Sequence, residues 1–550
     1  MPSFSSRKGR DASRAHPPDK EPLEALFKGC RKCVDSHTWK QIAALCGGNP
    51  DAEAFPALLK DDGEALALPA FLPELALLEL TIHKVKSQAT DMTKEVQELG
   101  VNPALELLQV SWRHLPAMVH GDEGPSAKPE PGDTFILVWC DPDAGHVRTR
   151  QASDEDLLVL KLVVEGIDPD EAAAIGGLPV GAVDSAIHRA LHRGLLVAPP
   201  SGIRRDPVSF PLGEVTDQRF LSSPVFTLQW HITQTCDLHC KHCYDRANRS
   251  PLKLEDGLRL LDELRDFCLS RHVRGQISFT GGNPLLYPHF LELYQGASDR
   301  GLGMAILGNP APRKRMEQLL AIAPPLFFQV SLEGLEKHND TIRGPGNFRR
   351  VMDFLGLLQD LDITSMVMLT LTRDNMDQVL PLAEMLRGRT DHFNFNRLSM
   401  VGEGAMLHLP QRDAYRSFLE AYMEAAEGNP IMGLKDNLLN LLRYQRGMDL
   451  FGGCAGYGCS AAFNFMAVLS DGEVHACRKF PSFVGNVFEQ SLAEIYDSEI
   501  ACRYRSGCKG CQSCPIRPVC GGCLAIAHSF GHDIFEERDP YCFMELPLTP

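Results

Sequence analysis

Three cysteines on one short segment have the spacing of a metal-cluster loop. Cys236, Cys240 and Cys243 form the pattern C-x3-C-x2-C within the run Thr235–Tyr244. Three thiolates on one tight loop can ligate three irons of a [4Fe–4S] cube and leave the fourth iron open to bind a small molecule and pass it an electron. Zinc is the alternative, but it favours four ligands in paired C-x2-C or Cys/His sets. The triplet therefore favours an iron–sulfur cluster.

A second group of cysteines lies near the C-terminus. The chain has 18 cysteines, of which ten lie after residue 450 and only four precede residue 200. The block contains the run Cys511-x2-Cys514-x5-Cys520-x2-Cys523. This is metal-ligand spacing in a large chain, unlike the disulfide framework of a small secreted domain. Taken alone, the C-x2-C pairs fit zinc knuckles and iron–sulfur clusters equally well.

Composition narrows the class of protein. The 550 residues are 44% hydrophobic and 23% charged, which is typical of a globular chain of about three or four domains. The net charge of −16 argues against a general binder of nucleic acid or anionic membranes. The most apolar stretch, Leu66–Leu80, is interrupted by Pro69 and Pro73 and cannot span a bilayer. Because residues 1–20 contain no secretory signal, we expect a cytoplasmic protein.

From residue 226 onward, β-rich runs alternate with amphipathic segments. Strands are expected at Phe226–Thr233, Gln276–Thr280, Met304–Leu307, Phe327–Leu332, Thr364–Thr372 and His392–Leu398. Helices are expected between them at Leu254–Leu269, Met316–Ile322 and Phe348–Leu361. This alternation predicts an α/β fold with a parallel sheet and crossover helices. Ligands in such folds bind at the carboxyl ends of the strands, where the cysteine triplet lies.

Polar side chains alternate with phenylalanines on the last of these strands. Asn394 and Asn396 fall on one face, and Arg397 falls on the other. If the asparagine face points into the barrel, both amides reach a ligand pocket; otherwise they are solvated.

Further motifs follow the second, third and fourth strands in the order that radical S-adenosylmethionine (SAM) enzymes show. Gly281-Gly282-Asn283-Pro284 follows the second strand, Gly308-Asn309-Pro310 follows the third, and Ser331-Leu332-Glu333 ends the fourth. Together with the cysteine triplet, this order resembles the radical SAM family. The resemblance implies a partial (β/α)6 barrel, a [4Fe–4S] cluster at Cys236, Cys240 and Cys243, and SAM as a cofactor that is cleaved to a 5′-deoxyadenosyl radical. The residues it implies as SAM contacts are Gly281, Gly282, Asn283, Pro284, Asn309, Ser331, Glu333 and Arg343.

These contacts have a physical basis and one departure from the family pattern. Glycines let the backbone approach a ligand, and the guanidinium of Arg343 matches the carboxylate of SAM. Asn283 stands where the family usually carries an acid. Any charge attraction from that side chain is therefore lost.

The C-terminal block resembles the SPASM extension of peptide-modifying radical SAM enzymes, which carries two auxiliary [4Fe–4S] clusters. The resemblance assigns Cys454, Cys459, Cys477 and Cys523 to the first cluster. It assigns Cys511, Cys514, Cys520 and Cys542 to the second. The spacing Cys520-x2-Cys523 is one residue shorter than usual. No role is assigned to Cys30, Cys33, Cys268, Cys502 or Cys508, although Cys508 is near enough in sequence to be a substitute ligand.

The chain before the barrel divides by pattern into several parts. We expect a disordered arm at 1–20, a helical domain at 21–130, a winged-helix-like domain at 131–200 and a linker at 201–225. The barrel then covers 226–450 and the SPASM domain 451–550. Residues 131–200 resemble the small winged-helix domain that binds leader peptides in peptide maturation. A DNA-binding wing is the alternative, but 11 acidic against 5 basic residues, a local net of −6, is unfavourable for phosphate contacts.

These features together predict a maturase that modifies a ribosomally made peptide, closest to those acting on small cysteine- or selenocysteine-containing peptides. Its partners would be a substrate peptide with a leader and an electron donor of flavodoxin or ferredoxin type. One alternative is a formylglycine-forming sulfatase maturase, but the position after Cys477, where that group carries an acidic base, is Arg478. The other is a non-catalytic zinc-binding regulator with a DNA-binding wing. The sequence identifies neither a general base nor the peptide.

Overall fold

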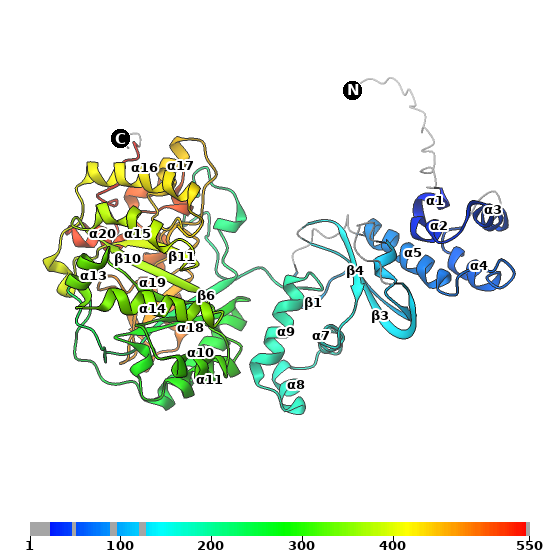
Figure 1. The fold of residues 1–550 in the computed structure, drawn as a ribbon, viewed down its shortest axis with the longest axis horizontal. Coiled ribbons are helices and arrows are strands. Elements are labelled where there is room, and N and C mark those ends of the chain that lie inside the picture. The colour runs from blue at the N-terminus through cyan, green and yellow to red at the C-terminus, as the bar shows by residue number, and fades with distance from the viewer. Residues whose placement is uncertain (1–21, 47–50, 89–95, 120–127, 143, 546–550) are drawn as a thin grey trace, which may run out of the picture. The chain divides into compact units, whose positions relative to one another are not determined.

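The computed structural model describes residues 22–46, 51–88, 96–119, 128–142 and 144–545 (Figure 1). It consists of two compact units. The first comprises residues 1–168 and 186–199, and the second comprises residues 169–185 and 200–550. The arm expected at 1–20 lies outside the described residues.

The first unit combines short helices with a three-stranded antiparallel sheet. Its helices before the sheet are α1 (Leu23–Leu26), α2 (Lys28–Lys32), α3 (Ser36–Leu45), α4 (Phe55–Asp61) and α5 (Leu72–Gln88), and α6 (Pro116–Val119) lies between the first two strands of the sheet. The sheet has the order β2 (Leu105–Arg113), β3 (Glu130–Cys140) and β4 (Val147–Gln151). Buried residues of α5, β2 and β3 belong to one hydrophobic core.

This shared core corrects the expected division at residue 130. The segment 21–130 is not uniformly helical, because β2 lies within it and pairs with β3 along most of its length. The leucines of β2 resemble an amphipathic helix in isolation, but pairing with a distant strand overrides local propensity. The short strand β1 (Gly100–Val101) also pairs with β5 (Leu196–Val197).

Three helices follow β4: α7 (Asp154–Glu165), α8 (Pro169–Gly176) and α9 (Val180–His192). A capping box in which the Ser153 and Asp156 side chains bond each other's backbone N–H groups starts α7. Residues 169–185 belong to the second unit, where Arg265 pairs with Asp170 at 2.5 Å and with Asp184 at 2.7 Å. The segment 131–200 is therefore divided between the two units.

The second unit contains the predicted parallel sheet. Its six strands are β6 (Val225–Thr233), β7 (Arg274–Gly281), β8 (Gly303–Leu307), β9 (Phe328–Ser331), β10 (Ser365–Leu371) and β11 (His392–Arg397). They are hydrogen-bonded in sequence order and parallel. The helices of this region are α10 (Leu254–Ser270), α11 (Phe290–Asp299), α12 (Arg313–Leu320), α13 (Glu336–Arg343), α14 (Asn347–Asp360) and α15 (Val379–Leu386). The predicted α/β fold and its strands are confirmed.

The same sheet continues into the cysteine-rich region. Strand β12 (Phe465–Val468) pairs in parallel with β6, and β13 (Glu473–His475) and β14 (Phe483–Asn486) follow as an antiparallel extension. The remaining helices are α16 (Arg412–Gly428), α17 (Leu439–Gln445), α18 (Leu492–Asp497), α19 (Glu499–Ser506) and α20 (Leu524–Ser529). Because barrel and C-terminal residues share one core, the loops that carry the two groups of cysteines are held by one framework.

The expected linker also packs against this framework. Arg205 is buried and donates to the backbone carbonyls of Arg505, Tyr457 and Cys459 at 2.6–3.2 Å. Among the helices of the described residues, none is long and apolar enough to cross a membrane.

Candidate active site and metal-cluster sites

The cysteine triplet lies on the loop that follows β6, at the carboxyl end of the parallel strands. β6 ends at Thr233, and the next helix begins only at Leu254. Cys236 is exposed, and Cys240 and Cys243 are partly buried. All three line one cavity of about 800 Å³. The triplet is therefore at the edge where parallel sheets bind their ligands.

Gly281 and Gly282 allow the end of β7 to approach this loop. Gly282 N–H donates to the Thr233 carbonyl at 2.8 Å. A Cβ on Gly281 would lie 2.2 Å from that carbonyl oxygen, and a Cβ on Gly282 would lie 2.3 Å from the Thr235 carbonyl oxygen. Gly281 also has a φ of +136°, which disfavours other residues. From the sequence we expected this close approach to serve a ligand. In the structure it also joins the cysteine loop to the segment that follows β7.

Asp237 anchors the cysteine loop, and the sequence interpretation did not single it out. Asn283 Nδ2 donates to Asp237 Oδ1 at 3.0 Å, and Asn309 Nδ2 donates to the same oxygen at 2.6 Å. Arg350 lies 3.2 Å from Oδ2. Burial raises the pKa of Asp237, but these three donors outweigh it and lower the pKa. The departure at position 283 now has a reason, because an amide can donate to Asp237 and an ionised acid cannot.

Asn309 also reaches the triplet itself. Its Nδ2 lies 3.6 Å from Cys236 Sγ, and its side chain lines the cavity. Pro284 begins a short 3₁₀ turn, Pro284–Leu286, and does not line the cavity. The two asparagines thus act on the loop that carries the cysteines.

Glu333 and Arg343 form a buried pair next to the triplet. Arg343 Nη1 donates to Glu333 Oε1 at 2.8 Å, and His242 Nε2 lies 3.3 Å from the same oxygen. Burial opposes charge on Glu333, but His242 and Arg343 hold its pKa at about 2. Arg343 and Ser331 line the cavity, and Glu333 does not. Arg343 Nε is buried and has no hydrogen-bond partner among the described residues, so any ligand contact of this guanidinium has to come from its terminal nitrogens.

Four of the downstream cysteines line the same large cavity. They are Cys454, Cys459, Cys477 and Cys523. Burial raises the pKa of Cys459 to about 12 and that of Cys477 to about 11. Thiols of this kind ionise when a metal binds them, and metal binding then contributes to the stability of the fold.

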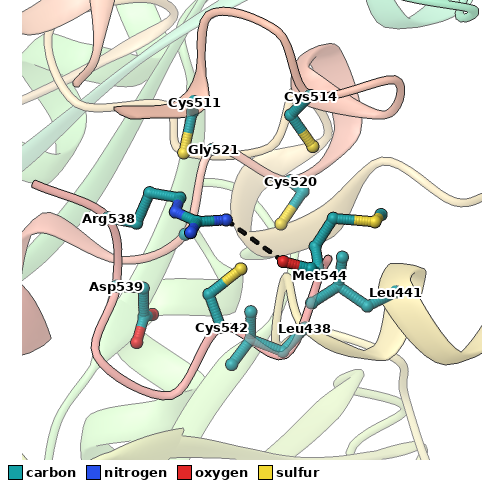
Figure 2. Close-up of a pocket in the computed structure, with 11 residues that line it drawn as sticks. Leu438, Leu441, Cys511, Cys514, Cys520, Gly521, Arg538, Asp539, Cys542 and Met544 are labelled. Atoms are coloured by element: carbon teal, nitrogen blue, oxygen red, sulfur yellow. Dashed lines mark hydrogen bonds between the residues drawn. The ribbon is translucent and has the colours of Figure 1, made fainter. Parts of the chain in front are cut away.

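The other four cysteines line a second, smaller cavity. Figure 2 shows the sulfur atoms of Cys511, Cys514, Cys520 and Cys542 directed into one space. Arg538 crosses the edge of this space and donates to the Met544 carbonyl at 3.1 Å. The two cavities thus divide the eight cysteines into the same two sets of four that the resemblance assigned.

The eight downstream cysteines are not arranged around single metal ions. Within the described residues, no three Cys, His, Asp or Glu side chains are placed to hold one metal ion. A four-iron cube is larger than one ion and needs its thiolates correspondingly further apart. Cys508 lines neither cavity, and a hydrogen bond from Cys511 lowers its pKa to about 7. Its role remains unassigned.

A buried ionic network joins the last barrel strand to the C-terminal region. Arg397 donates to Asp436 at 2.8 Å and to Asp539 at 2.6 and 3.0 Å. Asp539 Oδ2 also accepts from Cys523 N–H at 3.0 Å. The predicted alternation on β11 is confirmed, since Arg397 is buried and the asparagines are partly exposed. In the sequence, the signal for this network was the position of Arg397 on the face of β11 opposite the asparagines. Asn396 lines the large cavity, and Asn394 does not.

Comparisons with known proteins agree with this geometry. The family model of the radical SAM superfamily matches residues 230–386, and the SPASM iron–sulfur cluster-binding domain matches residues 459–523. An AdoMet-dependent heme synthase of Methanosarcina barkeri is 27% identical over 339 residues, which cover 57% of this chain and 95% of the relative. The mycofactocin maturase MftC of Mycolicibacterium smegmatis is 25% identical over 346 residues, which cover 59% of this chain and 84% of the relative.

A solved structure shows the same fold. SuiB of Streptococcus suis, bound to its precursor peptide SuiA, aligns with a TM-score of 0.50 and 17% identity over 75% of this chain and 97% of SuiB. Radical SAM and SPASM domains bind SAM with one [4Fe–4S] cluster and further auxiliary iron–sulfur clusters, and the named relatives are enzymes. The chain is therefore a radical SAM iron–sulfur enzyme with a C-terminal SPASM domain.

Proposed function

We propose that this enzyme modifies a ribosomally made peptide, forming a crosslink or a heterocycle. The observation that carries the proposal is the cavity of about 800 Å³, which is lined both by the triplet and by Cys454, Cys459, Cys477 and Cys523. A substrate held there would be near both the cysteines that would hold the SAM-binding cluster and the four that would hold a fully cysteine-ligated auxiliary cluster. Such a cluster suits electron transfer better than binding of the substrate to iron.

The residues at the triplet fit SAM and its cluster. Cys236, Cys240 and Cys243 would hold three irons, and the guanidinium of Arg343, which lines the cavity, would bind the carboxylate of SAM. Reductive cleavage of SAM at this site supplies a 5′-deoxyadenosyl radical that removes hydrogen from an unactivated carbon.

The chain's own contribution is to orient the reactants and exclude water. Asn283 and Asn309 fix the cysteine loop through Asp237. Met368 and Phe395 contribute apolar wall to the cavity. Ser331 and Gly282 line it at the strand ends, where they can contact SAM.

Three observations support a peptide as the substrate. The mycofactocin maturase and the sporulation killing factor maturation protein SkfB of Bacillus subtilis are named for maturation. The SuiB structure contains a precursor peptide, and its likeness spans 75% of this chain. The segment 131–200 is acidic and contains an antiparallel hairpin, β3–β4, which suits leader capture better than DNA binding.

A tetrapyrrole is the second candidate substrate, because relatives named heme synthases match the same region. A sulfatase-maturase activity is disfavoured by Arg478, since an arginine ion-paired with Asp245 cannot serve as a base.

The experiment is to supply the reconstituted, chemically reduced enzyme with SAM and one of two substrates. These are a short peptide encoded next to its gene and iron coproporphyrin. The proposal predicts that the peptide loses two hydrogen atoms by mass spectrometry, and that removing its N-terminal leader stops the modification while 5′-deoxyadenosine still forms. Modification of the porphyrin alone would overturn it. A flavodoxin or ferredoxin should replace the chemical reductant.

A further inference from the structure

Residues 203–215, in the segment expected to be a linker, pack against the loops that carry both auxiliary sets of cysteines. One terminal nitrogen of Arg205 donates to the Cys459 carbonyl at 3.1 Å. Further along, the Glu214 N–H donates at 2.8 Å to the carbonyl of Pro515, directly after a cysteine of the second set. The segment precedes the barrel in the sequence, yet it is built into the region that would bind the auxiliary clusters.

Two arginines in this region are buried without a counter-ion. Arg205 is 6% exposed and Arg517 is 3% exposed. Arg205 donates to three backbone carbonyls and Arg517 to the Ser506 carbonyl, but over the described ranges of the chain neither forms an ion pair with a carboxylate. Their guanidinium carbons lie 4.3 and 4.2 Å from the centre of the Phe210 ring. Carbonyls and an aromatic ring supply no full negative charge, and buried charges in proteins are normally paired.

The groups that can supply the opposite charge are the auxiliary cysteines. Burial lowers the pKa of Arg205 to about 9, and Cys459 is the neighbour that most opposes this shift. Burial also lowers the pKa of Arg517, and Cys511 is the neighbour that most opposes it. A cube ligated by four thiolates carries a net negative charge, whereas buried thiols without metal are neutral. Each arginine therefore lies beside one of the two cysteine sets, which supplies its counter-charge when the cluster is bound.

We propose that Arg205 and Arg517 are the counter-charges of the two auxiliary clusters and raise their reduction potentials. Reduction adds an electron to a cluster and makes it more negative, so a buried positive charge favours the reduced form. Phe210, whose ring contacts both guanidinium groups, is the positioning residue. The inference goes beyond the proposed function, because it gives the segment before the barrel a role at the C-terminal clusters. It rests on the SPASM domain and on no particular substrate.

The test is a redox titration followed by EPR spectroscopy. The parent protein is the reconstituted full-length chain with Cys236, Cys240 and Cys243 replaced by alanine, so that only the auxiliary clusters contribute to the signal. Removing a unit charge within about 10 Å shifts a one-electron equilibrium about tenfold at an effective dielectric constant of about 20, which corresponds to about 59 mV. Arg205→Gln should lower the potential of one cluster by about this amount, and Arg517→Gln should lower that of the other.

Matched variants separate the charge from the contacts. Arg205→Lys and Arg517→Lys keep the charge but lose the planar fork, so their potentials should stay close to those of the parent protein. Arg204→Gln removes an exposed charge from the adjacent position and should leave both potentials unchanged.

A parent-like potential in either glutamine variant would overturn the role of that arginine. A potential that falls as far in the lysine variant as in the glutamine variant would do the same, because the charge would then not be the cause. If a glutamine variant fails to bind its cluster, the matched lysine variant decides. Full iron content with a parent-like potential supports the proposal, and an equal loss of iron overturns it. Because no substrate is present, this outcome is independent of the proposed action on a peptide.

Discussion

Asn283→Asp would place the acid that radical SAM enzymes usually carry at this position, yet the structure predicts that it harms the enzyme. Asn283 is 4% exposed, and its Nδ2 lies 3.0 Å from Asp237 Oδ1. An aspartate in the same rotamer would face Asp237 with a second negative charge. The cysteine loop, which Asp237 anchors, would lose a donor and gain a repulsion.

The size of the effect follows from the geometry. Two unit charges about 3 Å apart repel by roughly 5 kcal/mol at an effective dielectric constant of about 20. Asp237 is 31% exposed, so solvent screening reduces this to about 2–3 kcal/mol. Loss of the hydrogen bond alone, as in Asn283→Ala, costs about 1.5–3 kcal/mol because its acceptor is charged. Asn283→Asp should therefore be clearly worse than Asn283→Ala.

The assay is iron incorporation and peptide-independent 5′-deoxyadenosine formation, measured across a range of pH. Repulsion raises the pKa of the new carboxyl, so the deficit is largest at high pH and shrinks as the pH falls and that carboxyl becomes a donor. Asn248→Asp adds the same charge at an exposed position of the loop and should have little effect. Equal activity of Asn283→Asp and the native enzyme at high pH would refute the role assigned to Asp237.

Three further predictions concern the clusters and the fold. Cys511→Ala should remove about four irons per chain by iron analysis after reconstitution, whereas Cys508→Ala should remove none. The pKa of Asp156 is about 2 in the fold, below its value in the unfolded chain. Its contribution to the free energy of unfolding, about 1–2 kcal/mol, is therefore complete above about pH 4 and is lost as the pH falls to about 2. Hydrogen exchange of α7 should follow this pH profile, and Asp156→Asn should flatten it. Arg397→Met leaves two buried carboxylates unpaired and should cost about 3–5 kcal/mol in urea unfolding, whereas the exposed Arg387→Met should change the unfolding midpoint little. Equal iron contents of the Cys511 and Cys508 variants would contradict the cluster assignment. An unchanged exchange profile in Asp156→Asn would contradict the role of Asp156, and equal unfolding midpoints of the two arginine variants would contradict that of Arg397.

The barrel could be predicted because its signals are local. The period-two pattern of strands such as Phe226–Thr233 and the amphipathic pattern of Leu254–Leu269 depend on neighbours in sequence, and both elements formed within one residue of their predicted bounds. The sequence also predicted that Gly281 and Gly282 allow a close approach of the backbone. Their partner, the cysteine loop, could be predicted only in part, because it lies some forty residues earlier in the sequence.

Features built from distant segments were missed. Asp237 matters because Asn283, Asn309 and Arg350 converge on it from three segments distant in the sequence, and no spacing records that convergence. The helical prediction for 21–130 failed at β2 for the same reason, since only its pairing with β3 makes it a strand.

The central claim is that three cysteine sets hold three clusters and that only the triplet is needed for SAM cleavage. The direct measurement is anaerobic reconstitution of the native enzyme and of a variant with Cys236, Cys240 and Cys243 replaced by alanine. The account predicts about twelve irons and 5′-deoxyadenosine formation for the native enzyme, and about eight irons with no 5′-deoxyadenosine for the variant. Two zinc ions at the eight downstream cysteines, or SAM cleavage by the variant, would contradict it.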